Sequence, residues 1–129
     1  MALQVTAIML GVKDLAASKV FYGEGLGCPI AQDHPNFVSF DLGGGSSSLA
    51  LYEREAAAQD AGVPSEGSGY RGVSFHVIVP SAADVDEVIG KAVAAGGEIV
   101  KEAAASQWGG YFGYFSDPDG YLWKVASTA

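Results

Sequence analysis

The sequence predicts an α+β fold made of two modules, each with the order strand, helix and three strands (βαβββ). Three observations predict it. An apolar, strand-like segment precedes a helix start signal twice, at Asp14 and again at Ser81. Glycine clusters stop both predicted helices, and short apolar segments separated by turn residues follow each of them. The two copies share the order of their elements and differ greatly in side chains.

The first module is predicted to cover about residues 4–53. Residues 4–12 (QVTAIMLGV) are apolar and short enough for a buried strand. Asp14 is a good N-cap for a helix over 15–24, because its carboxylate can accept backbone N–H groups of the first turn. Glycines within 25–27 then end this helix. Three further strands are predicted, weakly at residues 29–32 and more clearly at 37–42 and 47–53.

Residues 54–71 are predicted to be a connector with little periodicity, in which the AAAQ piece could form a short helical turn. The second module, at about 72–127, repeats the order of the first. Its helix starts with a capping-box-like sequence at Ser81 and runs to about Ala95. Its strands are predicted at residues 72–79, 98–101, 111–115 and 121–126. Asp117-Pro118-Asp119-Gly120 is predicted to join the last two strands as a tight turn.

Length and composition exclude several classes of protein. The 129 residues (13.2 kDa) predict a single domain over 1–129. The content of 49% apolar and 17% charged residues excludes a disordered tail. The formal charge of -8 repels nucleic acids and anionic lipid surfaces, so we expect neither as a partner. The same charge tolerates or favours a neutral or cationic small molecule.

The expected compartment is the cytoplasm. Cys28 is the one cysteine and cannot form an internal disulfide, which fits a reducing environment. No apolar run of about 18 residues occurs, so no membrane span is expected. The first residues lack the basic start and the long apolar stretch of a signal peptide.

An ordered set of short motifs covers nearly the whole chain. It comprises Leu10-Gly11-Val12-Lys13-Asp14-Leu15, Ser18, Phe21-Tyr22, Gly25-Leu26-Gly27, Ala94-Ala95-Gly96-Gly97, Trp108-Gly109-Gly110, and Asp117-Pro118-Asp119-Gly120 with Trp123. In this set the chain resembles the vicinal oxygen chelate superfamily, which includes glyoxalase I, extradiol dioxygenases, fosfomycin-resistance enzymes and bleomycin-binding proteins. The resemblance implies two βαβββ modules whose mixed sheets curve around a cup. It does not choose an activity.

The resemblance also implies where a metal would bind. Metal-using members hold a divalent ion in the cup with four His, Gln or Glu side chains. The corresponding positions here are Ala7, Ala50, Ser74 and Lys124. An alanine methyl has no lone pair, a serine hydroxyl is a poor ligand, and a lysine ammonium only donates hydrogen bonds and repels a cation. We therefore expect neither a metal nor another cofactor.

Strand alternation predicts which other side chains face the cup, because residues two apart share a face. Ser74 brings His76 to the cup, and Ala50 brings Tyr52. The direction of the strand 111–115 stays open, so that either Tyr111 and Phe115 or Phe112 and Tyr114 line the cup. The predicted ligand-binding residues are Tyr52, Ser74, His76, Trp108, Tyr111 and Lys124. No residue is assigned as catalytic.

Each of these residues has a simpler alternative. His76 is equally well explained as a structural, hydrogen-bonded histidine. The ammonium of Lys124 can point to solvent while its stem covers apolar surface. Trp108 can cap the core edge instead of stacking on a flat ligand. Cys28 has no basic neighbour in sequence and is expected to be an inert thiol.

These inferences favour a metal-free binding protein rather than an enzyme. The expected ligand is a small molecule such as an aromatic or cationic antibiotic or natural product, and the expected assembly is a homodimer, as the resemblance to the bleomycin-resistance branch implies. The alternative is a glyoxalase-like lyase, isomerase or dioxygenase with an atypical metal site, or an enzyme that uses His76 as acid or base. A third alternative is a dimeric interaction module with a filled cup.

Overall fold

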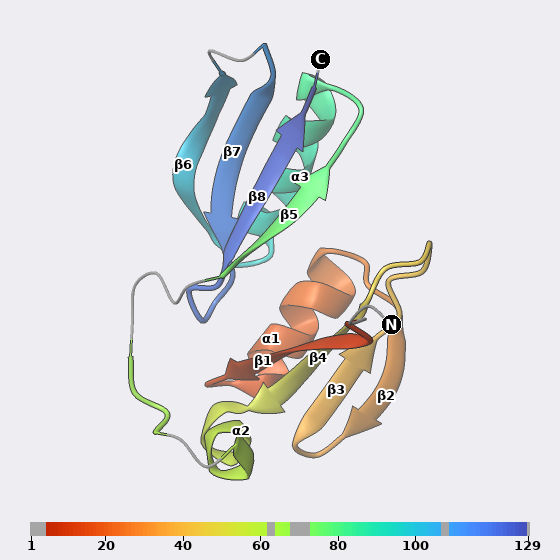
Figure 1. The fold of residues 1–129 in the computed structure, drawn as a ribbon, viewed down its shortest axis with the longest axis vertical. Helices are drawn as coiled ribbons and strands as arrows, with labels where there is room; N and C mark the ends of the chain where they lie inside the picture. The colour runs from red at the N-terminus through yellow and green to blue at the C-terminus, as the bar shows by residue number, and fades with distance from the viewer. Residues whose placement is uncertain (1–4, 62–63, 68–72, 107–108, 129) are drawn as a thin grey trace. The chain divides into compact units, whose positions relative to one another are not determined.

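The same order of elements occurs twice along the chain. The computed structural model describes residues 5–61, 64–67, 73–106 and 109–128. The chain divides into two units, Met1–Glu66 and Gly67–Ala129, each with a four-stranded mixed sheet and a helix between its first two strands (Figure 1). This confirms the α+β class and the two tandem βαβββ modules.

The first unit is built on a sheet with the strand order β1-β4-β3-β2. Its elements are β1 (Ala7–Val12), α1 (Leu15–Val20), a π-helical turn η1 (Phe21–Gly25), β2 (Ile30–His34), β3 (Phe37–Phe40), β4 (Ser48–Glu53) and α2 (Arg54–Ala61). β1 runs parallel to its neighbour β4, and the other neighbours are antiparallel. The parallel pair arises because α1 carries the chain across the sheet between β1 and the hairpins.

The helix of the first unit begins where the sequence predicts. The side chain of Asp14 accepts a hydrogen bond of 3.0 Å from the backbone N of Ala17. The predicted single helix over 15–24 is wrong in its second half, because the backbone N of Leu26 donates to the carbonyl of Phe21, five residues earlier. This wider π turn accompanies the burial of two successive aromatic residues, Phe21 and Tyr22, in the core.

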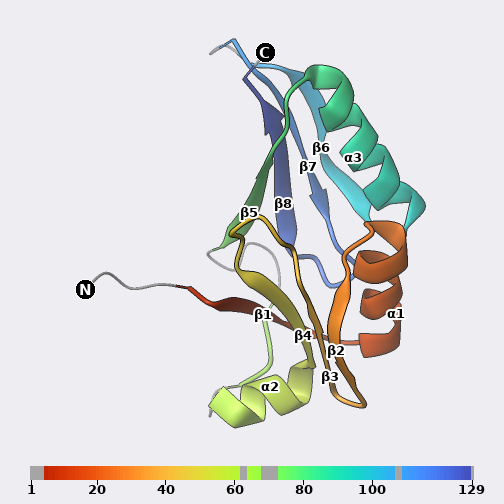
Figure 2. The same cartoon turned by 90° about the vertical axis from the view of Figure 1, so that its right-hand side faces the viewer.

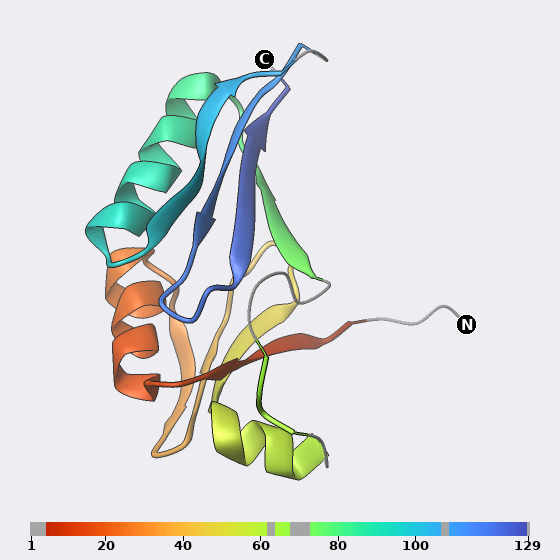
Figure 3. The same cartoon turned by 90° about the vertical axis from the view of Figure 1, so that its left-hand side faces the viewer.

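The connector begins with a complete helix, α2, where only a helical turn was expected. The carboxylate of Glu53 accepts the backbone N–H groups of Glu55 and Ala56, which caps the first turn. Alanines then favour helix continuation. α2 approaches the sheet at Gly11, where a Cβ atom would lie 3.5 Å from the Cα of Arg54. It lies on the side of the sheet away from α1 (Figures 2 and 3).

The second unit repeats this plan in the strand order β5-β8-β7-β6. Its elements are β5 (Ser74–Ile78), α3 (Ala82–Ala94), β6 (Glu98–Ala105), β7 (Tyr111–Ser116) and β8 (Leu122–Ser127). Ser81 caps α3 as predicted, with its hydroxyl oxygen accepting from the backbone N of Asp84 at 3.2 Å. Gln4 and Gly72, where the first strand of each module is predicted to begin, lie outside the described residues.

α3 packs along one face of the second sheet (Figures 2 and 3). Val85 and Ile89 of the helix are buried, as are Phe115 of β7 and Val125 of β8, two of the strands that α3 contacts. Gly113 allows this close approach, because a Cβ atom there would lie only 2.9 Å from the Cδ1 of Ile89 and the Cα of Ala103. The contact therefore fixes which side of β7 faces the helix.

The predicted turn at Asp117 sets the register of the last hairpin. The Oδ1 of Asp117 accepts from the backbone N of both Asp119 and Tyr121 at 2.9 Å, and its own N donates to the carbonyl of Tyr121. The hairpin closes directly before this turn, with Ser116 opposite Leu122.

β6 is longer than predicted, since the expected strand at 98–101 continues to Ala105. Two irregularities interrupt its pairing with β7, between Ile99 and Lys101 and between Lys101 and Ala104. Among the described residues, no helix has the length and apolar character that crossing a membrane requires.

Candidate binding face of the second unit

One row of side chains crosses the second sheet on the face away from α3, here called the distal face. The register joins Lys101 of β6 to Tyr114 of β7, Tyr114 to Lys124 of β8, and Lys124 to His76 of β5. Gly113 faces α3, so its neighbours Phe112 and Tyr114 point to the distal face. The sheet thus aligns two cationic groups, a phenol and an imidazole from all four strands.

Phe112 lies two residues before Tyr114 on β7 and therefore on the same distal face. The Nζ of Lys124 lies 4.5 Å from the centroid of the Phe112 ring, and the Nζ of Lys101 lies 4.7 Å from it. The rings of Phe112 and Tyr114 have centroids 6.3 Å apart and are close to perpendicular. Each contact has the geometry of a favourable cation–π or edge-to-face interaction.

A hydrogen-bonded pair continues this group of side chains on β5. The hydroxyl of Ser74 and the Nε2 of His76 are 3.1 Å apart, and the imidazole tautomer decides which of them donates. His76 is exposed and Ser74 is half-buried. The pair therefore offers both a donor and an acceptor beside the ammonium of Lys124.

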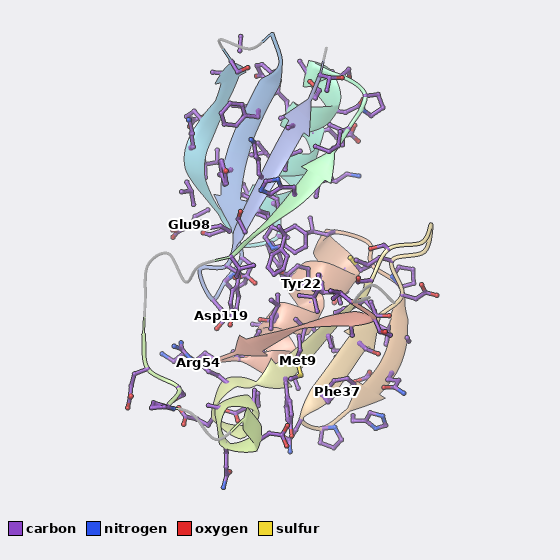
Figure 4. All side chains as sticks on the ribbon, viewed as in Figure 1. Met9, Tyr22, Phe37, Arg54, Glu98 and Asp119 are labelled. Carbon is purple, nitrogen blue, oxygen red and sulfur yellow. The ribbon has the colours of Figure 1, made fainter. Side chains whose placement is uncertain are left out.

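The charge of this region differs from that of the chain as a whole. The chain carries 15 acidic and 7 basic residues, yet Lys101 and Lys124 meet at one ring. Lys19 and Lys91, elsewhere in the described ranges, each form an ion pair with a carboxylate. Glu98 lies at the start of the edge strand β6 (Figure 4), in register with Ser116 and one row from Lys101.

Tyr111 does not join this face. It alternates with Phe112 along β7, and its hydroxyl donates a hydrogen bond of 2.8 Å to the Oδ1 of Asp86 on α3. That hydrogen bond, together with burial and the negative charges of Asp86 and Glu102, raises the pKa of Tyr111. Of the two alternatives left open for this strand, the structure has Phe112 and Tyr114 on the distal face.

Tyr52 and Trp108 are not residues of the described second sheet. Tyr52 belongs to the first unit, where its ring meets that of Phe37 edge-on at 6.1 Å. Trp108 lies outside the described residues. Ser74, His76 and Lys124 are the predicted residues that the second sheet brings together.

Sequence reasoning missed Lys101 altogether. Strict alternation from Glu98 would place Lys101 on the opposite face, because the two are an odd number of residues apart. The irregularity between Ile99 and Lys101 reverses this alternation, so that both residues are in register with distal-face residues of β7. Nothing in the sequence marks that irregularity.

Comparison with known proteins assigns the chain to a family. The sequence matches the Glyoxalase/Bleomycin resistance protein/Dioxygenase superfamily over residues 4–125. The chain belongs to this superfamily. A glyoxalase-related enzyme from Fulvimarina pelagi has 33% identity and a TM-score of 0.87, over 98% of this chain and 88% of that one. A search of curated proteins finds no match for this chain.

Further solved structures of similar fold carry different names. A hypothetical protein from S. aureus has 26% identity and a TM-score of 0.83, over 98% of this chain and 94% of that one. A lactoylglutathione lyase from Agrobacterium tumefaciens has 23% identity and a TM-score of 0.71, over 96% of this chain and 92% of that one, which shows the shared fold alone. Membership of the superfamily therefore leaves the activity open.

The side chains at the four expected ligand positions do not fit a superfamily metal. Ala7 and Ala50 present methyl groups, and Lys124 presents an ammonium that lies over Phe112. Ser74 is the remaining position, and its hydroxyl is engaged with His76. In the part of the chain that the structure describes, no group of three or more His, Cys, Asp or Glu side chains is arranged to hold a metal ion.

Proposed function

We propose that this superfamily member binds a small aromatic molecule on the distal face of its second sheet, without a metal ion. The observation that carries the proposal is the meeting of two aromatic rings, Phe112 and Tyr114, with the polar groups of His76 and Lys124 on one sheet face. Rings supply flat apolar area, and a few polar groups orient the ligand, which is typical of small-molecule sites.

The chemistry of the ligand positions supports the metal-free part of the proposal. Two methyl groups, a hydroxyl and an ammonium supply no set of lone pairs for a divalent ion. The role that fits such a site is sequestration of a natural product or an antibiotic. The sheet then determines the shape of the binding site, and hydrogen bonds from its polar groups determine which ligand it accepts.

Calorimetric titration with cinnamamide, a flat and uncharged compound, tests the proposal. The protein is treated with EDTA, and its metal content is measured by elemental analysis. We expect saturable binding that added zinc or nickel leaves unchanged. Tyr114→Ala should weaken this binding about three- to tenfold, the range that one aromatic contact supplies.

The matched control is Tyr111→Ala, which removes the same side chain from the same strand on its α3 face. It should leave the affinity for cinnamamide unchanged. Binding that Tyr111→Ala weakens and Tyr114→Ala does not would assign the ligand to the other side of the sheet. No binding until a metal is added would favour a metalloenzyme.

One observation favours a second candidate function, proton transfer by His76. The Nε2 of His76 lies 3.1 Å from the Ser74 hydroxyl, within the range of a general base and its partner. An isomerase or hydrolase would use this pair. Turnover of a substrate by metal-stripped protein, lost in His76→Gln, would establish the enzyme in place of the binding protein.

A homodimer is also part of the proposal, because members of the bleomycin-resistance branch, which the chain resembles, share their cups between two chains. Sedimentation velocity should give about twice the chain mass of 13.2 kDa. A strict monomer at all protein concentrations would contradict it.

A further inference from the structure

Two ammonium groups converge on one aromatic ring at the proposed site. Lys101 comes from β6 and Lys124 from β8, on either side of β7, and both Nζ atoms lie within 4.7 Å of the Phe112 centroid. The two Nζ atoms therefore lie no farther apart than the sum of their distances to this centroid. At such separations, two like charges repel each other, while the ring attracts both of them.

No carboxylate among the described residues forms an ion pair with either ammonium. On α3, by contrast, Lys91 forms an ion pair with Glu87 at 3.7 Å. Glu98 shares the distal face at the sheet edge but is in register with Ser116, not with either lysine. Lys101 and Lys124 thus lie together without an acidic partner among the described residues, in a chain with 15 acidic and 7 basic residues.

Hydrogen-bonding groups lie beside these two ammonium groups. His76 on β5 lies opposite Lys124 on β8. The hydroxyl of Ser74 lies 3.1 Å from the Nε2 of His76. An oxyanion beside Lys124 can accept hydrogen bonds from an ammonium and from the imidazole or hydroxyl at once. Such charge-assisted hydrogen bonds are about twice as strong as neutral ones.

We infer that the ligand of this face is an aromatic carboxylate, whose negative group is attracted by the ammonium groups of Lys101 and Lys124 and whose ring contacts Tyr114. This inference rests on the proposed function and specifies its ligand class. It differs from the neutral or cationic ligand that the overall charge favours, because the local charge at the site has the opposite sign. The Lys124 ammonium would supply, in part, the positive charge that a metal supplies elsewhere.

Three compounds with the same aromatic frame and different charge test the inference. Cinnamate is an anion, cinnamamide is neutral and cinnamylamine is a cation near neutral pH. Each is titrated into the EDTA-treated full chain by calorimetry at low and high salt. We expect cinnamate to bind at least about tenfold more tightly than cinnamamide, since each charge-assisted hydrogen bond contributes about that factor.

Lysine variants locate the preference. Lys101→Gln and Lys124→Gln should each weaken the binding of cinnamate more than that of cinnamamide, and so remove most of the advantage of cinnamate. Lys91→Gln, which removes an ammonium from α3, is the matched control and should change neither. Salt should weaken the binding of cinnamate more than that of cinnamamide, since it screens exposed charges.

The outcomes separate the inference from the proposed function. Equal binding of cinnamate and cinnamamide would overturn the carboxylate ligand and keep the aromatic binding site. Tightest binding of cinnamylamine would overturn the carboxylate ligand in favour of a cation. Binding of none of the three would overturn both. An advantage of cinnamate that persists in both lysine variants would place the carboxylate elsewhere.

Discussion

The Nζ of Lys124 lies 4.5 Å from the ring centroid of Phe112 in the neighbouring strand, and this contact joins two rows of the distal face. A cation at this distance is attracted by the ring quadrupole. It directs the ammonium across the sheet, whereas a solvent-directed lysine was one of the two alternatives at the sequence level. Position 124, where the resemblance implies a His, Gln or Glu ligand in metal-using members, here supplies a positive charge.

A double-mutant cycle measures this contact. Lys124→Gln and Phe112→Leu, alone and combined, are expected to give a coupling free energy of about 0.5–1 kcal/mol, because an exposed cation–π pair contributes that much. Urea unfolding of the four proteins supplies the values. Additive effects of the two substitutions would show that the side chains do not interact in solution.

Gly113 is predicted to be essential for the packing of α3. Gly113→Ala should lower the free energy of unfolding by about 1–3 kcal/mol, because its Cβ would lie 2.9 Å from Ile89 and Ala103. Gly90→Ala is the control, since a Cβ there has nothing within 4 Å. That helical position should gain up to about 1 kcal/mol from the propensity of alanine. Equal effects at both positions would contradict the close contact.

The hydrogen bond from Tyr111 to Asp86 is predicted to make stability fall at high pH. The pKa of Tyr111 is raised, so the folded chain holds this proton more tightly than the unfolded chain does. Its stabilising contribution is present below the ordinary tyrosine pKa of about 10 and is lost as the pH rises through the raised value. Thermal unfolding of Tyr111→Phe should show a smaller loss of stability in that range. An unchanged pH profile would refute the assignment.

Cys28 is predicted to react slowly with thiol reagents. Burial raises its pKa, so the thiolate fraction is smaller than that of a free cysteine. At about pH 8, DTNB should modify the folded protein several-fold more slowly than the protein unfolded in guanidinium. Equal rates would mean that the thiol is neither buried nor shifted in its pKa.

The sequence was sufficient for features that local chemistry controls. Asp14 and Ser81 cap their helices because short polar side chains accept backbone N–H groups, whatever surrounds them. The Asp117 turn forms through its own side chain for the same reason. The family resemblance placed Ser74 and Lys124 on one face, and alternation along β5 added His76, which agrees with the regular pairing of β5 and β8.

Features that depend on pairing between strands could not be predicted. Lys101 reaches the distal face through an irregularity of β6 that depends on its partner β7. The direction of Tyr111 depends on the register of β7, which the closure of the hairpin at Ser116 and Leu122 sets. The extension of β6 through alanines 103–105 has no strand signal, because alanine is depleted in strands.

The most direct test of the account is an NMR titration of cinnamamide into EDTA-treated protein with isotope-labelled phenylalanine and tyrosine rings. We predict that the ring signals of Phe112 and Tyr114 shift together and saturate, and that those of Phe115 and Tyr111 on the α3 face stay in place. Shifts confined to the α3 face, or shifts of Phe112 and Tyr114 that require an added divalent metal, would contradict metal-free binding on the distal face.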